Sequence, residues 1–223
     1  IVGCTIQHSH DADDSANIRL NSECLPRPFT TELRHGNIVI AHNVLSDAQW
    51  NIDLQNSRGV AITGNTMWKG YARNLRAVGC DSLVVQGNVS DCNPRYHYGD
   101  GAKAKLGMEF EKCNDCTLAN NHFQGGADPD AAIFMKQCRR FQVLGLTVLD
   151  AGHCGLLWED VSHSRLADCM IRNDQSNGDD HYSLRVVGSS HNMIVDNWLG
   201  NRSLIDSNAS HIAGNIREKS VEN

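Results

Sequence analysis

The 223-residue chain has little of several features that mark whole classes of protein. Aromatic residues make up 6%, and only four prolines accompany 19 glycines, which excludes collagen-like and proline-rich chains. No segment approaches the ~18 to 20 consecutive apolar residues that a membrane-spanning helix needs. The 20 lysines and arginines are outnumbered by 26 acidic residues and form no basic cluster. We therefore expect a globular protein that binds neither nucleic acid nor membrane.

What the chain does contain is a repeat. An apolar residue, two small or polar residues and then asparagine recur, as in Ile62-Thr-Gly-Asn65. Most intervals between successive motif ends are close to 23 residues, and the longer ones are consistent with the same unit carrying a loop. In the middle of the series two other residues replace the asparagine. The motif ends are Cys4, Asn43, Asn65, Asn88, Asn121, Leu146, Cys169, Asn197 and Asn215.

Each motif end is preceded at a fixed distance by alternating apolar residues. Eleven residues earlier stand Leu54, Ala77, Phe110, Met135, Trp158, Val186 and Leu204, and two residues before most of these stands another apolar residue. A period of two indicates a strand. The gaps are too short for the helices of βαβ units, and an antiparallel sandwich does not explain one fixed spacing. We expect three short strands per repeat, stacked in parallel as a solenoid.

These features resemble the right-handed parallel β-helix of the pectin-lyase-like superfamily, from Ile1 to about Arg217. The resemblance implies an all-β fold of about eight coils of ~23 residues, with a ladder of stacked asparagines at one bend. We expect one domain over residues 1–223. Ile1 falls inside a second-strand motif, so the chain is interpreted as a fragment truncated at its N-terminus. Extracellular or periplasmic placement is favoured over the cytoplasm.

Nine cysteines are an odd number, so at least one of them is unpaired. Cys80, Cys113 and Cys138 share one position in the repeat and should stack through consecutive coils. We expect the cysteines mainly to fill the core as small apolar residues. Disulfides or a metal site remain the alternatives.

With this register, the outward side chains of the first strands fall into two rows. Neighbouring coils lie ~4.8 Å apart, so each row is a line of side chains at that pitch. The central row is Arg19, Asp53, Arg76, Glu109, Phe134, Leu157 and Arg185. The C-terminal row is Gln55, Val78, Glu111, Lys136, Glu159 and Val187. The second row contains a carboxylate–lysine–carboxylate cluster, which suits acid–base chemistry or, as readily, a salt-bridged solvated face.

Loop insertions are expected to flank this face. Those that join a third strand to the next first strand are Gln7–Ser15, Asn93–Lys105 and Asp174–Tyr182, with Gly125–Asp130 as a shorter relative. Cys24–His35 would form the opposite wall. Long loops on a rigid scaffold commonly carry function. A charged face between two walls suits an extended polymer, and the resemblance implies a polysaccharide or oligosaccharide partner.

Two chemistries fit such a groove. In a uronate lyase or epimerase, a cation neutralises the sugar carboxylate and a base removes the C5 proton. Arg76 or a Ca²⁺ ion would supply the cation, and the candidates for the base are Lys136, His97 and Tyr96. The calcium ligands would be Asp100, Asp128 and Asp130, although the sequence has no calcium-loop spacing.

In an inverting glycoside hydrolase, Glu111 and Glu159 would flank the scissile bond at about 6.5 to 9.5 Å. Lys136 between them would lower both pKa values and hinder the general acid. We place the lyase or epimerase first. The catalytic candidates are Glu111, Lys136, Glu159, Glu109 and Arg76. The substrate-binding candidates are Asp53, Tyr96, His97, Asp100 and Arg185.

A non-catalytic surface or glycan-binding module is the alternative from another class. An enzyme requires the Asn93–Lys105 loop to meet Lys136. In a binding module the charged side chains are instead splayed or paired with one another.

Overall fold

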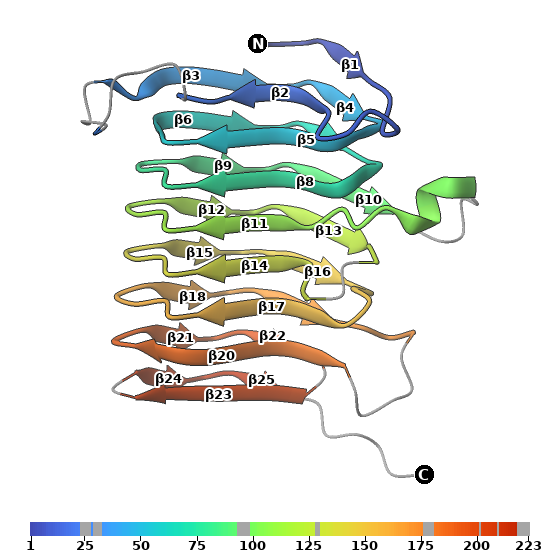
Figure 1. Ribbon diagram of the computed structural model, residues 1–223. Helices are drawn as coiled ribbons and strands as arrows, with labels where there is room; N and C mark the ends of the chain where they lie inside the picture. The colour runs from blue at the N-terminus through green and yellow to red at the C-terminus, as the bar shows by residue number, and fades with distance from the viewer. Residues whose placement is uncertain are drawn as a thin grey trace.

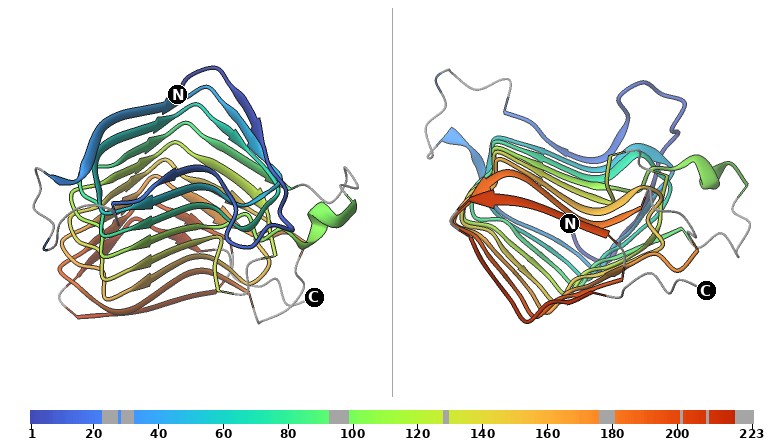
Figure 2. Two further views of the ribbon diagram at one scale, coloured as in Figure 1. Left: turned by 45° about the horizontal axis from the view of Figure 1, so that its top comes forward. Right: turned by 90° about the horizontal axis from the view of Figure 1, so that it is seen from below.

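The computed structural model describes residues 1–22, 28, 33–92, 99–127, 130–175, 181–200, 202–208 and 210–217. They form a stack of coils, each built from three strands that pair in parallel with the coils above and below (Figure 1). Seen along the stack axis, the three sheets enclose a common core (Figure 2). The predicted right-handed parallel β-helix is confirmed, and among the described residues no helix has the length and apolar character needed to cross a membrane.

Each coil from β2 onward contributes one strand to each sheet, and β1 is an additional strand of the third sheet. The first sheet, which faces the viewer in Figure 1, contains β2 (Ala16–Leu20), β5 (Ala48–Gln55), β8 (Gly70–Val78), β11 (Met108–Glu111), β14 (Ile133–Lys136), β17 (Cys154–Glu159), β20 (Tyr182–Ser190) and β23 (Arg202–Asn208). The second sheet contains β3 (His35–Ala41), β6 (Ser57–Thr63), β9 (Val84–Gln86), β12 (Thr117–Ala119), β15 (Gln142–Leu144), β18 (Arg165–Ala167), β21 (Met193–Val195) and β24 (His211–Ala213). The third sheet contains β1 (Thr5–Gln7), β4 (Val44–Ser46), β7 (Thr66–Met67), β10 (Val89–Cys92), β13 (His122–Gly125), β16 (Thr147–Leu149), β19 (Met170–Arg172), β22 (Trp198–Leu199) and β25 (Ile216–Arg217).

The apolar positions predicted to point inward form the core. Leu54, Ala77, Phe110 and Trp158 are fully buried in it. Burial of such side chains contributes roughly 1.5 to 3 kcal/mol each and is the main stabilising term of the stack.

The predicted inward position of Leu204 is wrong. Leu204 pairs with Arg185 on the outer face and is 46% exposed, while Ile205 pairs with Val186 and packs on the core. The register between β20 and β23 shifts after Val186, so Leu204 and Ile205 lie one residue away from the positions that their distance from Asn215 predicts. Because side chains alternate with a period of two, that displacement exchanges the inward and outward residues.

The predicted asparagine ladder runs through Asn43, Asn65, Asn88 and Asn121, is interrupted where the sequence departs from the motif, and resumes between Asn197 and Asn215. The Asn88 amide donates to Asn121 Oδ1 at 2.9 Å, and Asn65 donates to Asn88 Oδ1 at the same distance. In the interrupted coils the Cys169 thiol accepts from the backbone N–H of Leu146 at 3.4 Å. Sulfur is a weak acceptor, so this coil boundary is held less strongly than the asparagine-capped ones.

A second ladder was not predicted. Asn17, Asn51 and Asn74 stack at the start of the first strands, where Asn17 donates to Asn51 at 2.7 Å and Asn51 donates to Asn74 at 2.6 Å. Asn17 and Asn51 also donate to backbone carbonyls at a corner of the next coil, including Trp68 O, which Asn51 binds at 3.0 Å. The sequence signal was the recurrence of asparagine one residue before the inward Ile18, Ile52 and Leu75.

The cysteine stack is confirmed, and its members are thiols. Cys113 Sγ donates to Ala77 O and Cys138 Sγ donates to Phe110 O, each at 3.3 Å and each across one coil. Every cysteine whose state the structure describes is free: Cys4, Cys80, Cys113, Cys116, Cys138, Cys154 and Cys169. Apart from the exposed Cys4, these residues are buried, and most of them fill the main core as expected. Cys154 is the exception, because it belongs to a separate apolar cluster.

Candidate functional site

The outer face of the first sheet carries both predicted rows in the predicted order. The register places Asp53 beside Arg76 and Arg76 beside Glu109, and it places Lys136 between Glu111 and Glu159. The eight strands span roughly 34 Å at ~4.8 Å per strand. This sheet is therefore a long, regular surface on which side chains from distant parts of the sequence stand in lines.

Asp53 is the centre of a charge cluster on the N-terminal coils. Its side chain is fully buried, although it belongs to an outward row. Arg76 binds both of its carboxylate oxygens, with Nε 2.8 Å from Oδ1 and Nη2 3.0 Å from Oδ2, and Arg19 Nε lies 2.9 Å from Oδ2. Burial alone would lower the pKa of Arg76, but its hydrogen bond to Asp53 and the charge of Asp53 outweigh burial and raise that pKa. Asp53 thus orients two guanidinium groups and is itself shielded from a ligand.

Trp50 and Asp14 complete this cluster. The Arg76 guanidinium lies over the Trp50 ring at 4.2 Å, and Trp50 Nε1 donates to Asp14 Oδ1 at 3.2 Å. Asp14 also accepts from Arg19 Nη2 at 3.0 Å. Two arginines and two carboxylates therefore neutralise one another around one aromatic ring.

Glu109 and Asp130 both interact with Arg73. Arg73 Nε lies 2.7 Å from Glu109 Oε2, and its Nη2 lies 3.5 Å from Asp130 Oδ2. Glu109 is a predicted catalytic residue and Asp130 a predicted calcium ligand. In the structure each is a counter-ion of an arginine from the neighbouring coil.

The carboxylate–lysine–carboxylate cluster is assembled but loosely joined. Lys136 Nζ lies 3.6 Å from Glu159 Oε2, while Glu111 Oε1 lies 2.9 Å from the Nζ of its sequence neighbour Lys112. The three side chains are between 30 and 43% exposed. Exposed pairs of this kind contribute little to stability and leave the ionisable groups close to solvent.

The loops that precede the first-sheet strands reach that sheet where the strands begin. The carboxylate–lysine–carboxylate cluster lies where the strands end. The insertion between β10 and β11 contains the short 3₁₀ helix η3 (Gly99–Lys103), which projects from the side of the stack in Figures 1 and 2. It precedes Met108, the first residue of β11, whereas Glu111 is the last. Asp100 lies in η3. Tyr96, His97 and Asp128 lie outside the described residues, as does most of the Cys24–His35 segment, so their predicted roles stay predictions.

An apolar patch lies on the outer face farther along the stack. Ala131, Cys154 and Leu157 are buried in a cluster separate from the main core, and the half-buried rings of Phe134 and Tyr182 pack against it. Sequence reasoning placed Phe134 and Leu157 in the central row without recognising a cluster. The available signal was an apolar residue at the same outward position in two consecutive coils. A sheet face that is covered only by solvent does not require apolar residues there.

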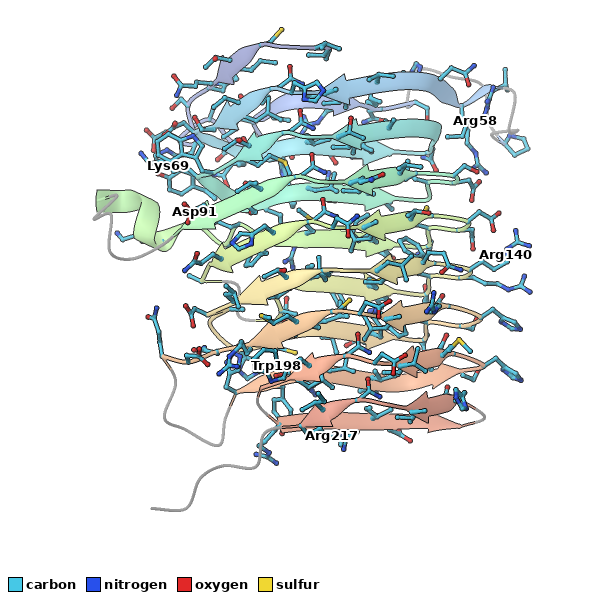
Figure 3. The ribbon with its side chains drawn as sticks, turned by 180° about the vertical axis from the view of Figure 1, so that it is seen from behind. Arg58, Lys69, Asp91, Arg140, Trp198 and Arg217 are labelled. Atoms are coloured by element: carbon cyan, nitrogen blue, oxygen red, sulfur yellow. The ribbon has the colours of Figure 1, made fainter. Side chains whose placement is uncertain are left out.

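The rest of the surface carries isolated pairs of interacting side chains. Figure 3 shows Trp198 of β22 from behind, and the Arg172 guanidinium lies 4.8 Å from that ring. At the turns between the first and second strands, the exposed rings of His163 and His191 stack at 5.0 Å. Arg140, on the same edge in Figure 3, pairs with Asp115.

The described residues do not support a calcium site. Within the ranges that the structure describes, no three His, Cys, Asp or Glu side chains gather in a way that would hold a metal ion. Calcium binds six to eight oxygens, whereas Asp130, one of the three predicted ligands, faces an arginine.

The architecture defines a class of protein, the right-handed parallel β-helices of the pectin-lyase-like superfamily. The model of one family within it, described as periplasmic copper-binding protein (NosD), matches residues 8–216. The chain belongs to the NosD family. The family's periplasmic description agrees with the predicted extracellular or periplasmic placement.

Two solved structures are similar to this chain in fold, at low sequence identity. A mutant of DFA-IIIase from Arthrobacter chlorophenolicus A6, in complex with DFA-III, has 10% sequence identity and a TM-score of 0.45, over 71% of this chain and 41% of that one. PfbA, a surface adhesin of Streptococcus pneumoniae, has 12% identity and a TM-score of 0.43, over 84% of this chain and 60% of that one. The chain thus spans less than two thirds of either protein. No curated protein matched it.

The described residues also do not fit copper. Copper sites use deprotonated cysteine, histidine or methionine ligands converging on one point. Here the stacked cysteines follow the coil axis in the core, and among the described residues they do not converge with other His, Cys, Asp or Glu side chains on one point. The stacked pair His163 and His191 has no third described His, Cys, Asp or Glu side chain placed to complete a metal site.

Proposed function

We propose that this chain binds an extended glycan along the outer face of the first sheet. One observation carries the proposal: charged and aromatic side chains stand in register on a single regular face through successive coils. A polymer with repeating hydroxyl or acidic groups can meet such rows repeatedly without a deep pocket. Aromatic rings supply stacking surfaces, and arginines supply paired donors.

Binding is placed ahead of catalysis. Lys136, the proposed base, is paired with Glu159, and Glu111 is paired with Lys112. The described part of the β10–β11 insertion enters at the other end of the first strands. These features are the ones expected of a binding module. The catalytic form of the same proposal has two versions. The first is a lyase or epimerase reaction that uses Lys136 and Arg76, and the second is an inverting hydrolase reaction that uses Glu111 and Glu159.

The binding test combines a polysaccharide panel with hydroxyl-radical footprinting. Uronate-containing and neutral polysaccharides are titrated by calorimetry, and the side chains that a bound ligand protects are mapped by mass spectrometry. Protection is expected at Phe134 and Tyr182 on the first sheet. Trp198 and Met193, which are exposed on the third and second sheets, serve as the controls. Protection of the controls instead, or no binding across the panel, would refute the proposal.

The same panel separates binding from catalysis. A lyase forms unsaturated products that absorb in the ultraviolet, and a hydrolase forms new reducing ends; both are followed with and without chelator. We expect neither product. If either forms, the double variant K136M/E159Q should abolish it, which would move the chain to the catalytic form of the proposal.

A further inference from the structure

The apolar patch on the first sheet lies beside an arginine that differs from the others on this face. Arg19, Arg76 and Arg73 each have a carboxylate within hydrogen-bonding distance. Arg185 has no carboxylate partner among the described residues, and its buried Nε has no hydrogen-bond partner there. A cation held on the protein surface without a counter-ion attracts an anion from solution.

The patch holds this arginine next to an aromatic ring. The Arg185 guanidinium lies 5.4 Å from the centre of the Tyr182 ring, and the guanidinium of Arg202, in the next coil, lies 5.0 Å from the same ring. Leu157 and Arg185 are neighbours across the strand pair β17–β20, and Phe134 is the neighbour of Leu157 in β14. Half-buried rings and a guanidinium therefore meet on three consecutive coils.

We infer that Phe134, Tyr182 and Arg185 form a subsite for a sugar that carries an acidic group, either a uronate carboxylate or a sulfate ester. The inference rests on the proposed function, because it assumes that a glycan lies along this face. The C–H face of the sugar packs on the rings, and the Arg185 guanidinium donates paired hydrogen bonds to the acidic group. Arg202 adds a second positive charge within reach of the same ring.

The second sheet offers a matched arginine. Among the residues that the structure describes, the buried Nε of Arg165 in β18 also has no partner, but Arg165 stands between Gln142 and Met193 in its row. It shares the unpaired guanidinium and differs in its surroundings. The R165Q variant therefore removes the same charge from the same kind of strand on another face.

The test measures Kd for two matched ligand pairs by calorimetry. Polygalacturonate is compared with its fully methyl-esterified form, and dextran sulfate with dextran. We expect the acidic member of at least one pair to bind more tightly, with the carboxylate and sulfate arms identifying the source. R185Q should weaken that binding about 10- to 100-fold, the range for losing a charge-assisted hydrogen bond, and R165Q should leave it unchanged.

A second variant distinguishes the loss of a ligand contact from the loss of folding. R185K retains the charge but not the paired donors, and it should give an intermediate affinity with an unchanged unfolding midpoint. Equal binding of acidic and neutral ligands, or equal effects of R185Q and R165Q, would overturn the subsite and leave the proposed glycan face intact. Absence of binding to all four polymers and to the wider panel would instead refute the glycan face itself.

Discussion

Arg76 binds Asp53 with two parallel hydrogen bonds, of 2.8 and 3.0 Å, from one coil to the next. This bidentate pair is shielded from water on the Asp53 side, and Arg19 holds the carboxylate from the coil on its other side. Charges on three coils are thereby joined through one buried acid. The arrangement makes Asp53 a positioning residue for the arginines of the proposed glycan face.

Replacing Asp53 should therefore destabilise the protein. D53N leaves Arg19 and Arg76 facing each other without the buried counter-charge, at an expected cost of about 3 kcal/mol in the free energy of unfolding. Urea unfolding measures this loss. D14N is the control, because the Asp14 side chain is 65% exposed and its loss should cost under about 1 kcal/mol. Equal effects of the two variants would contradict the assigned role of Asp53.

The asparagine ladder predicts that replacing one of its asparagines lowers the free energy of unfolding by an amount that depends on the position in the stack. N88A removes the acceptor of two Asn65 N–H groups and the donor to Ile62 O, and leaves them buried. We expect a loss of about 2 to 4 kcal/mol in the free energy of unfolding, since unpaired buried groups carry a full desolvation penalty. N215A, in the last coil, should cost less because Asn215 is only partly buried. The reverse order would show that the ladder does not stabilise the stack as described.

The buried thiols predict loss of stability in alkali. Burial raises the pKa of Cys116 and Cys154 to about 12 and that of Cys169 to about 11, from an ordinary 9.0. Between these values only the unfolded chain releases the thiol protons, so the folded state loses stability as pH rises above 9. Each pH unit in that range costs up to about 1.4 kcal/mol per thiol.

Unfolding measured at pH 8 and pH 10 checks this, with the triple variant C116A/C154A/C169A as the reference. The wild type should lose more stability than the variant between the two pH values. Peptide mapping after native alkylation gives an independent readout, in which the exposed Cys4 should react well before these three. An identical pH dependence in the variant would contradict the assignment.

His181 predicts that the stability of the folded protein also depends on pH in the acidic range. Burial lowers its pKa from 6.5, and its Nδ1 lies 3.3 Å from the Asn173 amide nitrogen, which can only donate. The neutral ring accepts that hydrogen bond, and protonation abolishes it. Because the unfolded chain binds the proton first, stability should fall as pH decreases below about 6.5 toward the lowered value.

Unfolding of the wild type and H181N at pH 7.5 and pH 5 measures this effect. The wild type should lose more stability on acidification than the variant, which lacks the titrating group. A variant that retains the full acid sensitivity would contradict the assignment to His181.

The sequence was sufficient for the path of the chain and for the order of the residues along each row. In a parallel stack, a residue's position within its coil fixes its neighbours above and below, so a repeated asparagine and a period of two determine which residues share a line. The sequence of Glu111, Lys136 and Glu159 followed in this way. It failed for Leu204, because a shift in the register between β20 and β23 exchanges the inward and outward residues of that segment.

Which of those neighbours interact was decided only by the tertiary structure. Asp53 and Glu111 both occupy outward positions, yet Asp53 is sealed between two arginines while Glu111 bonds the adjacent Lys112. The apolar surroundings of Arg185 likewise come from residues of three coils packing together. Spacing specifies a position along the coil, whereas burial and pairing depend on side-chain conformation and on the chain segments that cover each site.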